Sequence, residues 1–188
     1  MTWANRLTML RVVLAVAVFF ALLAEGAKWH ILAFVLFLAA IVTDWLDGWL
    51  ARRTGTTSPF GKVADPIADK ILVLGTFIAL IRTKDLDIPL WAVFLMIARE
   101  LLIGGVRVLA GAQGKVLAAE QGGKIKMFVQ SVAVLVLVAA VCLQDLGRAP
   151  AGLLKASGPL TILCALLSLS SLWTYLRQYR GMLEKSWS

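Results

Sequence analysis

Long runs of hydrophobic residues, separated by short polar segments, recur along the whole chain. A helix that crosses the hydrocarbon core of a bilayer needs roughly 17 to 25 mostly apolar residues. Six stretches approach that length, at residues 7–24, 29–49, 63–81, 88–110, 127–143 and 153–176. We therefore expect an all-α polytopic membrane protein with six transmembrane helices in one bundle, and a single domain over residues 1–188.

Composition and charge narrow the function classes. Hydrophobic residues make up 60% of the 188 residues and charged residues only 16%, which is too apolar for a soluble domain. The first run has basic residues before it, as a signal peptide does, but it is long enough to span a bilayer and five more runs follow. The formal net charge of +8 fits basic residues beside anionic lipid headgroups, so we expect no nucleic-acid partner.

The distribution of Lys and Arg predicts the orientation of the six helices. With the N-terminus in the cytoplasm, thirteen of these residues fall in inner segments and five in outer turns, with the intramembrane Arg99 left out. An excess of Lys and Arg on the cytoplasmic side is typical of membrane proteins. Both termini are therefore expected in the cytoplasm.

Four aspartates lie close to two of the apolar runs. Asp44 and Asp47 end one run, and Asp65 and Asp69 begin the next. A carboxylate at the centre of a spanning helix costs roughly 2.5 to 3.5 kcal/mol, so a cation must lie among them. Each pair falls on a single helix face at about 100° per residue, and a short turn near residues 55–59 allows the two faces to meet. All-oxygen, acid-rich sites bind hard divalent cations such as Mg²⁺ or Mn²⁺.

Small residues share these two faces. Gly48 and Ala51 lie beside the first pair of acids, Arg52 lies just off that face, and Gly61 continues the stripe of the second pair. Without large side chains, a flat or phosphorylated ligand can approach the backbone closely. The hairpin therefore combines a cation site with room for such a ligand.

The segment from Asp44 to Asp69 follows the pattern D-x₂-D-G-x₂-A-R-x₈-G-x₃-D-x₃-D, which fixes eight positions in 26 residues. Here the sequence resembles the CDP-alcohol phosphotransferase family, whose members are integral membrane enzymes. They transfer a phosphatidyl or related phosphoryl group from a CDP-linked donor to an alcohol and release CMP. The resemblance implies two Mg²⁺ or Mn²⁺ ions held by the four aspartates, with Asp65 and Asp69 catalytic and Asp69 acting on the attacking hydroxyl. It also implies a CDP site lined by Gly48, Ala51, Arg52 and Gly61.

A polar cluster near the N-terminus carries a second resemblance. Asn5, Thr8 and Arg11 form an N-x₂-T-x₂-R motif that is similar to the N-terminal motif of the same family. The similarity implies a place near the donor diphosphate and adds Thr8 to the residues that bind CDP. A helix start with an orientation-setting arginine explains the cluster equally well.

Charged residues interrupt the apolar run at 88–110. Arg99 and Glu100 lie within the run, and Arg107 returns to nearly the same helix face as Arg99. Intramembrane arginines are functional candidates by default. The alternative is an internal salt bridge, in which Arg99 neutralises part of the acidic site and Glu100 pairs elsewhere. For Arg107, nearer the expected cytoplasmic end, we expect phosphate binding.

Two lysines open the helix that follows a Gly-rich loop. Lys124 and Lys126 lie in a G-K-x-K-x₃-Q segment that ends at Gln130. Lysines at a helix N-terminus oppose the macrodipole, but they add to its attraction for anions. Together with Arg99 and Arg107, they predict an acceptor that carries its own phosphate.

The segments R-E-x₆-R and G-K-x-K-x₃-Q are similar to the corresponding regions of bacterial phosphatidylglycerophosphate synthases within the family. This similarity implies CDP-diacylglycerol as donor and glycerol 3-phosphate as acceptor. It also implies a homodimer in a bacterial inner membrane. The distribution of Lys and Arg puts the acidic hairpin, and with it the active site, on the cytoplasmic side.

Other functions share some of these features. A cardiolipin, phosphatidylserine or phosphatidylinositol synthase has parts of the same segments. A membrane prenyltransferase also has Asp-rich helices but does not need the Gly-x₂-Ala-Arg insert, and a divalent-cation transporter needs polar residues that continue to the outer face. His30 is the only histidine and lies far along the chain from the acids, while Cys142 and Cys164 have no metal or redox spacing. We therefore expect no histidine or cysteine chemistry.

Overall fold

The computed structural model describes the backbone of residues 3–54, 59–112 and 121–187, and the side chains of residues 6–46, 64–112, 122–123 and 125–180. All regular secondary structure in these ranges is helical, so the all-α prediction is confirmed there. The helices are α1 (Trp3–Leu23), α2 (Ala27–Thr54), α3 (Pro59–Leu80), α4 (Leu90–Ala112), α5 (Gln121–Asp145), α6 (Ala151–Lys155) and α7 (Ser157–Trp187).

The last predicted apolar run differs from the structure at its start. Instead of one helix over residues 153–176, the short α6 ends at Lys155 and α7 begins at Ser157. The backbone amide of Asp87 donates to Ser157 Oγ over 3.0 Å, and a Cβ on Gly158 would lie only 2.9 Å from the Asp87 carbonyl oxygen. The α3–α4 connection therefore packs against the start of α7, where only glycine fits without displacing the backbone.

Within the described residues, four segments are long and apolar enough to cross a bilayer, and they lie within α1, α2, α5 and the α6–α7 region. Because the main-chain polar groups of a helix bond within it, such helices are stable in lipid. The chain is therefore an integral membrane protein. The two other long helices carry the charged groups considered below, which are Asp65, Asp69 and Lys70 in α3 and Arg99, Glu100 and Arg107 in α4.

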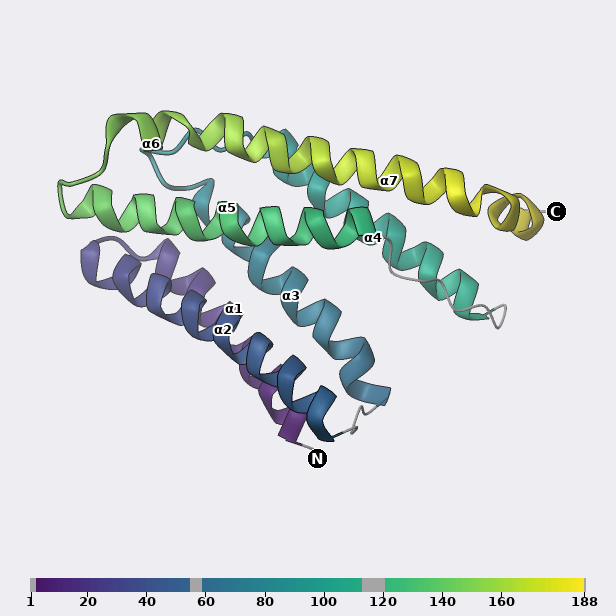
Figure 1. Cartoon of the computed structure of the whole chain (residues 1–188). Coiled ribbons are helices and arrows are strands. Elements are labelled where there is room, and N and C mark those ends of the chain that lie inside the picture. The colour runs from purple at the N-terminus through teal and green to yellow at the C-terminus, as the bar shows by residue number, and fades with distance from the viewer. Residues whose placement is uncertain (1–2, 55–58, 113–120, 188) are drawn as a thin grey trace.

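The long helices form one bundle (Figure 1). α1 packs against both α2 and α3, α4 packs against α7, and α5 contacts α2, α3 and α7. The N-terminus lies at the same end of the bundle as the last turns of α2 and α4 and the first turns of α3 and α5 (Figure 1). We call this the N-terminal end. The α1–α2, α3–α4 and α5–α6 connections lie at the opposite end, so the acidic segment of α2 and α3 belongs to the N-terminal half.

The middle of the bundle is filled by apolar side chains. Phe37 of α2, Phe77 of α3 and Leu137 of α5 are almost completely buried. Large apolar side chains also cover the outer surface, where Phe128 of α5 is 71% exposed. Lipid chains are as apolar as leucine, so this apolar outer surface is suited to contact with the bilayer.

We predict that Phe77→Ala lowers the free energy of unfolding by about 3 to 5 kcal/mol, because it leaves a cavity in a packed interior. The measurement is the thermal unfolding midpoint of the purified protein in detergent. Phe128→Ala is the matched control, and its midpoint should stay close to that of the unmodified protein. Equal losses for the two variants would contradict the packing described here.

Candidate active site

Arg11 joins three helices in the N-terminal half of the bundle. The side chain of this α1 residue is 1% exposed, and its Nη2 lies 2.8 Å from Asp44 Oδ1 on α2. Its Nη1 donates to Asp69 Oδ1 on α3 over 3.1 Å. A guanidinium can bind two carboxylates at once through its several donors, and burial makes both partners necessary. One of the cations that lie among the aspartates is therefore Arg11.

Thr8 lies one helical turn before Arg11 and binds a third aspartate. Its buried hydroxyl donates to Asp65 Oδ1 over 2.5 Å. Asp65 and Asp69 are also one turn apart, so one face of α1 meets one face of α3 in register. A role for Arg11 that is limited to helix orientation does not account for its burial or for its ion pairs to Asp44 and Asp69.

The aspartates have the donor chemistry of a site for a hard cation. Asp44, Asp65 and Asp69 bind neighbouring side chains of α1 and offer only oxygen atoms, which Mg²⁺ and Mn²⁺ prefer. Within the described side chains, no three His, Cys, Asp or Glu residues gather closely enough to hold a metal ion by themselves. The side chain of the fourth aspartate, Asp47, lies outside the described residues. The residues present therefore fit a divalent cation in chemistry.

For five other predicted site residues, the structure describes the helix but not the surroundings of the residue. These residues are Gly48, Ala51 and Arg52 in α2, Gly61 in α3 and Lys124 in α5. Their assignment to the nucleotide and to the acceptor phosphate stays a prediction.

Glu100 of α4 gathers three cations. Its side chain is 9% exposed, and its Oε1 accepts from Arg99 Nη1 over 2.8 Å and from Lys126 Nζ of α5. Its Oε2 lies 3.3 Å from Lys70 Nζ of α3. Within this cluster three cations meet one carboxylate, so two positive charges are left over. A buried excess of positive charge attracts an anion.

The predicted alternative for Arg99, an internal salt bridge, is present, but the expected partners are wrong: Arg99 does not pair with the acidic site, and Glu100 does not pair elsewhere. Arg99 binds Glu100 itself, and its Nη2 donates to Ser171 Oγ of α7 over 2.7 Å. The two residues are neighbours in the sequence, but the long arginine side chain reaches back to the carboxylate. Arg99 therefore belongs to the Glu100 cluster and links α4 to α7.

One cavity of about 240 Å³ has charged residues of both clusters in its wall. Its charged lining residues are Asp65, Asp69, Lys70, Arg99, Glu100, Arg107 and Lys126. The volume is below the roughly 300 to 1,000 Å³ of a drug-sized pocket, which suits a small polar ligand. Such a ligand would contact carboxylates of α3 and cations of α4 and α5 at the same time.

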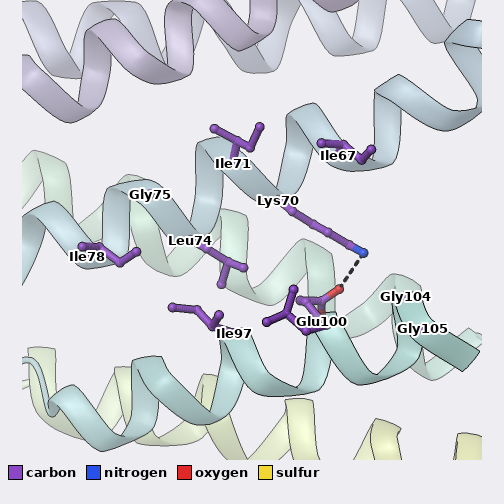
Figure 2. A pocket seen from close by; sticks show the side chains of 11 residues that line it. Ile67, Lys70, Ile71, Leu74, Gly75, Ile78, Ile97, Glu100, Gly104 and Gly105 are labelled. Atoms are coloured by element: carbon purple, nitrogen blue, oxygen red, sulfur yellow. Dashed lines mark ion pairs between the residues drawn. The ribbon is translucent and has the colours of Figure 1, made fainter.

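A second cavity, apolar and about 600 Å³ in volume, lies between α3 and α4. Figure 2 shows Leu74 of α3 and Ile97 of α4 on opposite sides of this space, with Gly104 further along α4. Lys70 and Glu100 line both this cavity and the polar one, and their ion pair crosses between the two helices (Figure 2). The ion pair therefore marks the boundary between a polar and an apolar space.

The only histidine takes part in a separate contact. His30, at the start of α2, has its Nδ1 2.6 Å from Asp145 Oδ2 at the end of α5, and Cys142 Sγ donates to the His30 carbonyl oxygen. These residues lie at the opposite end of the bundle from the aspartates that bind Arg11. The contact joins α2 to α5 and lies away from the polar cavity.

Comparison with known proteins decides the family. The CDP-alcohol phosphatidyltransferase profile matches residues 1–176. The chain belongs to the CDP-alcohol phosphatidyltransferase family. Enzymes of this family generally depend on a divalent metal, in agreement with the oxygen donors described above.

Several relatives within the family carry specific names. The chain is 41% identical over 109 residues to the CDP-diacylglycerol–glycerol-3-phosphate 3-phosphatidyltransferase of Bacillus subtilis, which covers 58% of this chain and 55% of that protein. It is 42% identical over 135 residues to a probable phosphatidylglycerophosphate synthase of Mycobacterium tuberculosis, covering 70% and 63%. It is 37% identical over 164 residues to a cardiolipin synthase (CMP-forming) of Oryza sativa, covering 80% and 49%. The chain thus spans about half to two-thirds of the length of these phosphatidyltransferases.

The central position of Glu100 was missed by sequence reasoning. A lone carboxylate within an apolar run requires a cation, and this was the available signal. Three candidates, Lys70, Arg99 and Lys126, come from three different helices, and nothing local in the sequence shows that all three bind it. For Ser171 there was no signal, because it is one of several similar serines along α7.

We predict that Arg11→Met destabilises the protein by about 1 to 3 kcal/mol, because it leaves the partly buried Asp69 and the more exposed Asp44 without their cation. The measurement is the thermal unfolding midpoint in detergent without added divalent metal. Adding Asp44→Asn to this variant should recover part of the loss. Arg148→Met, at an exposed position between α5 and α6, is the control and should have little effect. A midpoint for Arg11→Met that matches this control would show that the bridge to Asp44 and Asp69 does not support the fold.

Proposed function

We propose that this chain transfers the phosphatidyl group of CDP-diacylglycerol to the hydroxyl of glycerol 3-phosphate, giving phosphatidylglycerophosphate and CMP. The observation that carries the proposal is the polar cavity, where carboxylates of α3 face an excess of cations from α4 and α5. A donor diphosphate needs a cation held by carboxylates, and a phosphorylated acceptor needs free positive charge. The names of the bacterial relatives point to the same reaction.

The metal site in this proposal consists of Asp44, Asp47, Asp65 and Asp69, with two Mg²⁺ or Mn²⁺ ions. Bound there, a divalent ion supplies neutralisation of the donor diphosphate and polarisation of the phosphorus that is attacked. Arg11 holds Asp44 and Asp69 together, and Thr8 holds Asp65. These two α1 side chains would keep the carboxylates in place when the ions are absent.

The remaining residues bind and orient the substrates. Thr8, Gly48, Ala51, Arg52 and Gly61 would line the site of the CDP group. Cations of the Glu100 cluster, with Arg107 and Lys124, would hold the acceptor phosphate. Phosphoryl transfer depends largely on such positioning and on neutralisation of charge.

The reaction itself is a single displacement. The acceptor hydroxyl, oriented by Asp69, gives its proton to that carboxylate as its oxygen bonds to the phosphorus next to diacylglycerol. The bond from this phosphorus to the oxygen of the CMP group breaks at the same time, and CMP leaves. Asp69 and Lys126 line the same polar cavity, which supports this role for Asp69.

The setting in the membrane is also part of the proposal. We infer a single domain with six transmembrane helices, formed by α1 to α5 and α7, in a bacterial inner membrane with both termini and the active site on the cytoplasmic side. The shared location of the N-terminus and the α2, α3, α4 and α5 ends that carry the site supports this topology (Figure 1). A homodimer is proposed from family resemblance.

We predict that Asp65→Asn and Asp69→Asn each lower CMP release by about 100-fold or more, because each removes a carboxylate from the metal site. The assay uses purified protein, Mn²⁺, CDP-diacylglycerol and glycerol 3-phosphate. Both variants should elute from size exclusion like the unmodified protein. Asp85→Asn, an exposed acid at the opposite end, is the matched control. Near-normal turnover in either site variant would remove the proposed mechanism.

We predict that glycerol 3-phosphate supports CMP release at least about tenfold better than glycerol, serine or inositol, because the cation cluster requires an acceptor phosphate. Phosphatidylglycerol is included in the panel because of the cardiolipin synthase relative. If phosphatidylglycerol releases CMP faster than glycerol 3-phosphate, the chain is a cardiolipin-forming enzyme and the proposed acceptor is wrong.

A further inference from the structure

Glu100 lies among cations of three helices, and the proposed reaction gives Glu100 itself no role. Its two oxygens have different partners: Oε1 binds Arg99 and Lys126, and Oε2 faces Lys70. Because Lys70 is on α3 and Lys126 is on α5, one carboxylate of α4 determines the spacing of cations from three helices. Loss of this carboxylate would remove the one ion-pair partner that the three cations share, and only Arg99 would keep another described contact, to Ser171.

The Lys70–Glu100 ion pair lies between two cavities. The apolar cavity separates α3 from α4 on one side of the Lys70–Glu100 pair, and the polar cavity separates them on the other. Figure 2 shows the pair crossing this open interface. Between the two cavities, the Lys70–Glu100 ion pair joins α3 to α4.

The net charge of the Glu100 cluster indicates which kind of ligand it can bind. The side chain of Lys126 is 2% exposed and that of Lys70 is 28% exposed, so removal of the Glu100 carboxylate would leave the buried Lys126 without the negative charge that compensates it. With Glu100 in place the excess is two positive charges. A phosphate monoester carries about −1.5 to −2 at neutral pH, which matches that excess.

We propose that Glu100 is a positioning residue for the acceptor: it holds Lys70, Arg99 and Lys126 in the wall of the polar cavity so that they receive the acceptor's phosphate. Glu100 itself does not touch the reacting atoms. The inference rests on the proposed function for the identity of the acceptor, but the effect on phosphate binding can be measured without turnover.

The test is Glu100→Gln, which keeps the shape of the side chain and removes its charge. The affinity of metal-free protein for glycerol 3-phosphate, measured by calorimetry, should fall by about tenfold or more. In the CMP-release assay, KM for glycerol 3-phosphate should rise by a similar factor, while kcat and KM for CDP-diacylglycerol stay within about threefold of the unmodified values. Glu100→Asp keeps the charge on a shorter side chain and should recover part of the affinity.

The matched control is Asp145→Asn, which removes one partner of the His30 ion pair at the opposite end of the bundle. It should leave KM for glycerol 3-phosphate unchanged. Unchanged acceptor affinity in Glu100→Gln, or a loss of kcat without a change in KM, would overturn the positioning role. If Glu100→Gln does not fold, Glu100→Asp decides, and wild-type affinity in that variant overturns the role. If the unmodified protein binds glycerol 3-phosphate but releases no CMP with it, the proposed function fails and the binding comparison still tests Glu100.

Discussion

Compensation of charge inside a bundle of apolar helices is the constraint on which the rest of this structure depends. An ion moved from water into a protein interior loses several kcal/mol of solvation even after relaxation, so each charge needs a partner, often from another helix. Arg11 meets Asp44 and Asp69 in this way, and Glu100 meets cations of α3, α4 and α5. These contacts determine how α1 to α5 approach one another in the N-terminal half of the bundle.

The compensation is incomplete in both clusters, and the two excesses have opposite sign. On α2 and α3, Asp44 and Asp69 share the guanidinium of Arg11 and Asp65 binds the Thr8 hydroxyl, so among the contacts described here three carboxylates meet one cation. Around Glu100 positive charge remains. Because α3 contributes to both clusters, the two excesses meet in one small cavity. In the proposed reaction, metal ions balance the negative charge of the aspartates, and the acceptor phosphate balances the positive charge around Glu100. Both charges are therefore compensated only when metal and substrate are bound.

Local sequence pattern was enough for much of the fold and for part of the site. Apolar runs gave the long helices because length and hydropathy decide which segments enter a bilayer, and the spacing of Asp65 and Asp69 placed them on one face. The partners of Arg99 and Glu100 could not be obtained in this way. Each depends on which helices become neighbours, and a salt bridge between adjacent residues is not expected from helix periodicity. The break before Ser157 was missed for the same reason, since it comes from contact with the distant α3–α4 connection.

The central claim is that one cavity binds a divalent cation through aspartates and a phosphate through the opposing cations. The most direct measurement is a crystal structure of the protein grown with Mn²⁺ and glycerol 3-phosphate, with Mn²⁺ located by its anomalous scattering. The account predicts a Mn²⁺ peak in contact with the carboxylates of Asp44, Asp65 and Asp69, and phosphate density beside Lys126 and Arg107. A Mn²⁺ peak away from these carboxylates, or a phosphate bound outside the cavity, would contradict it.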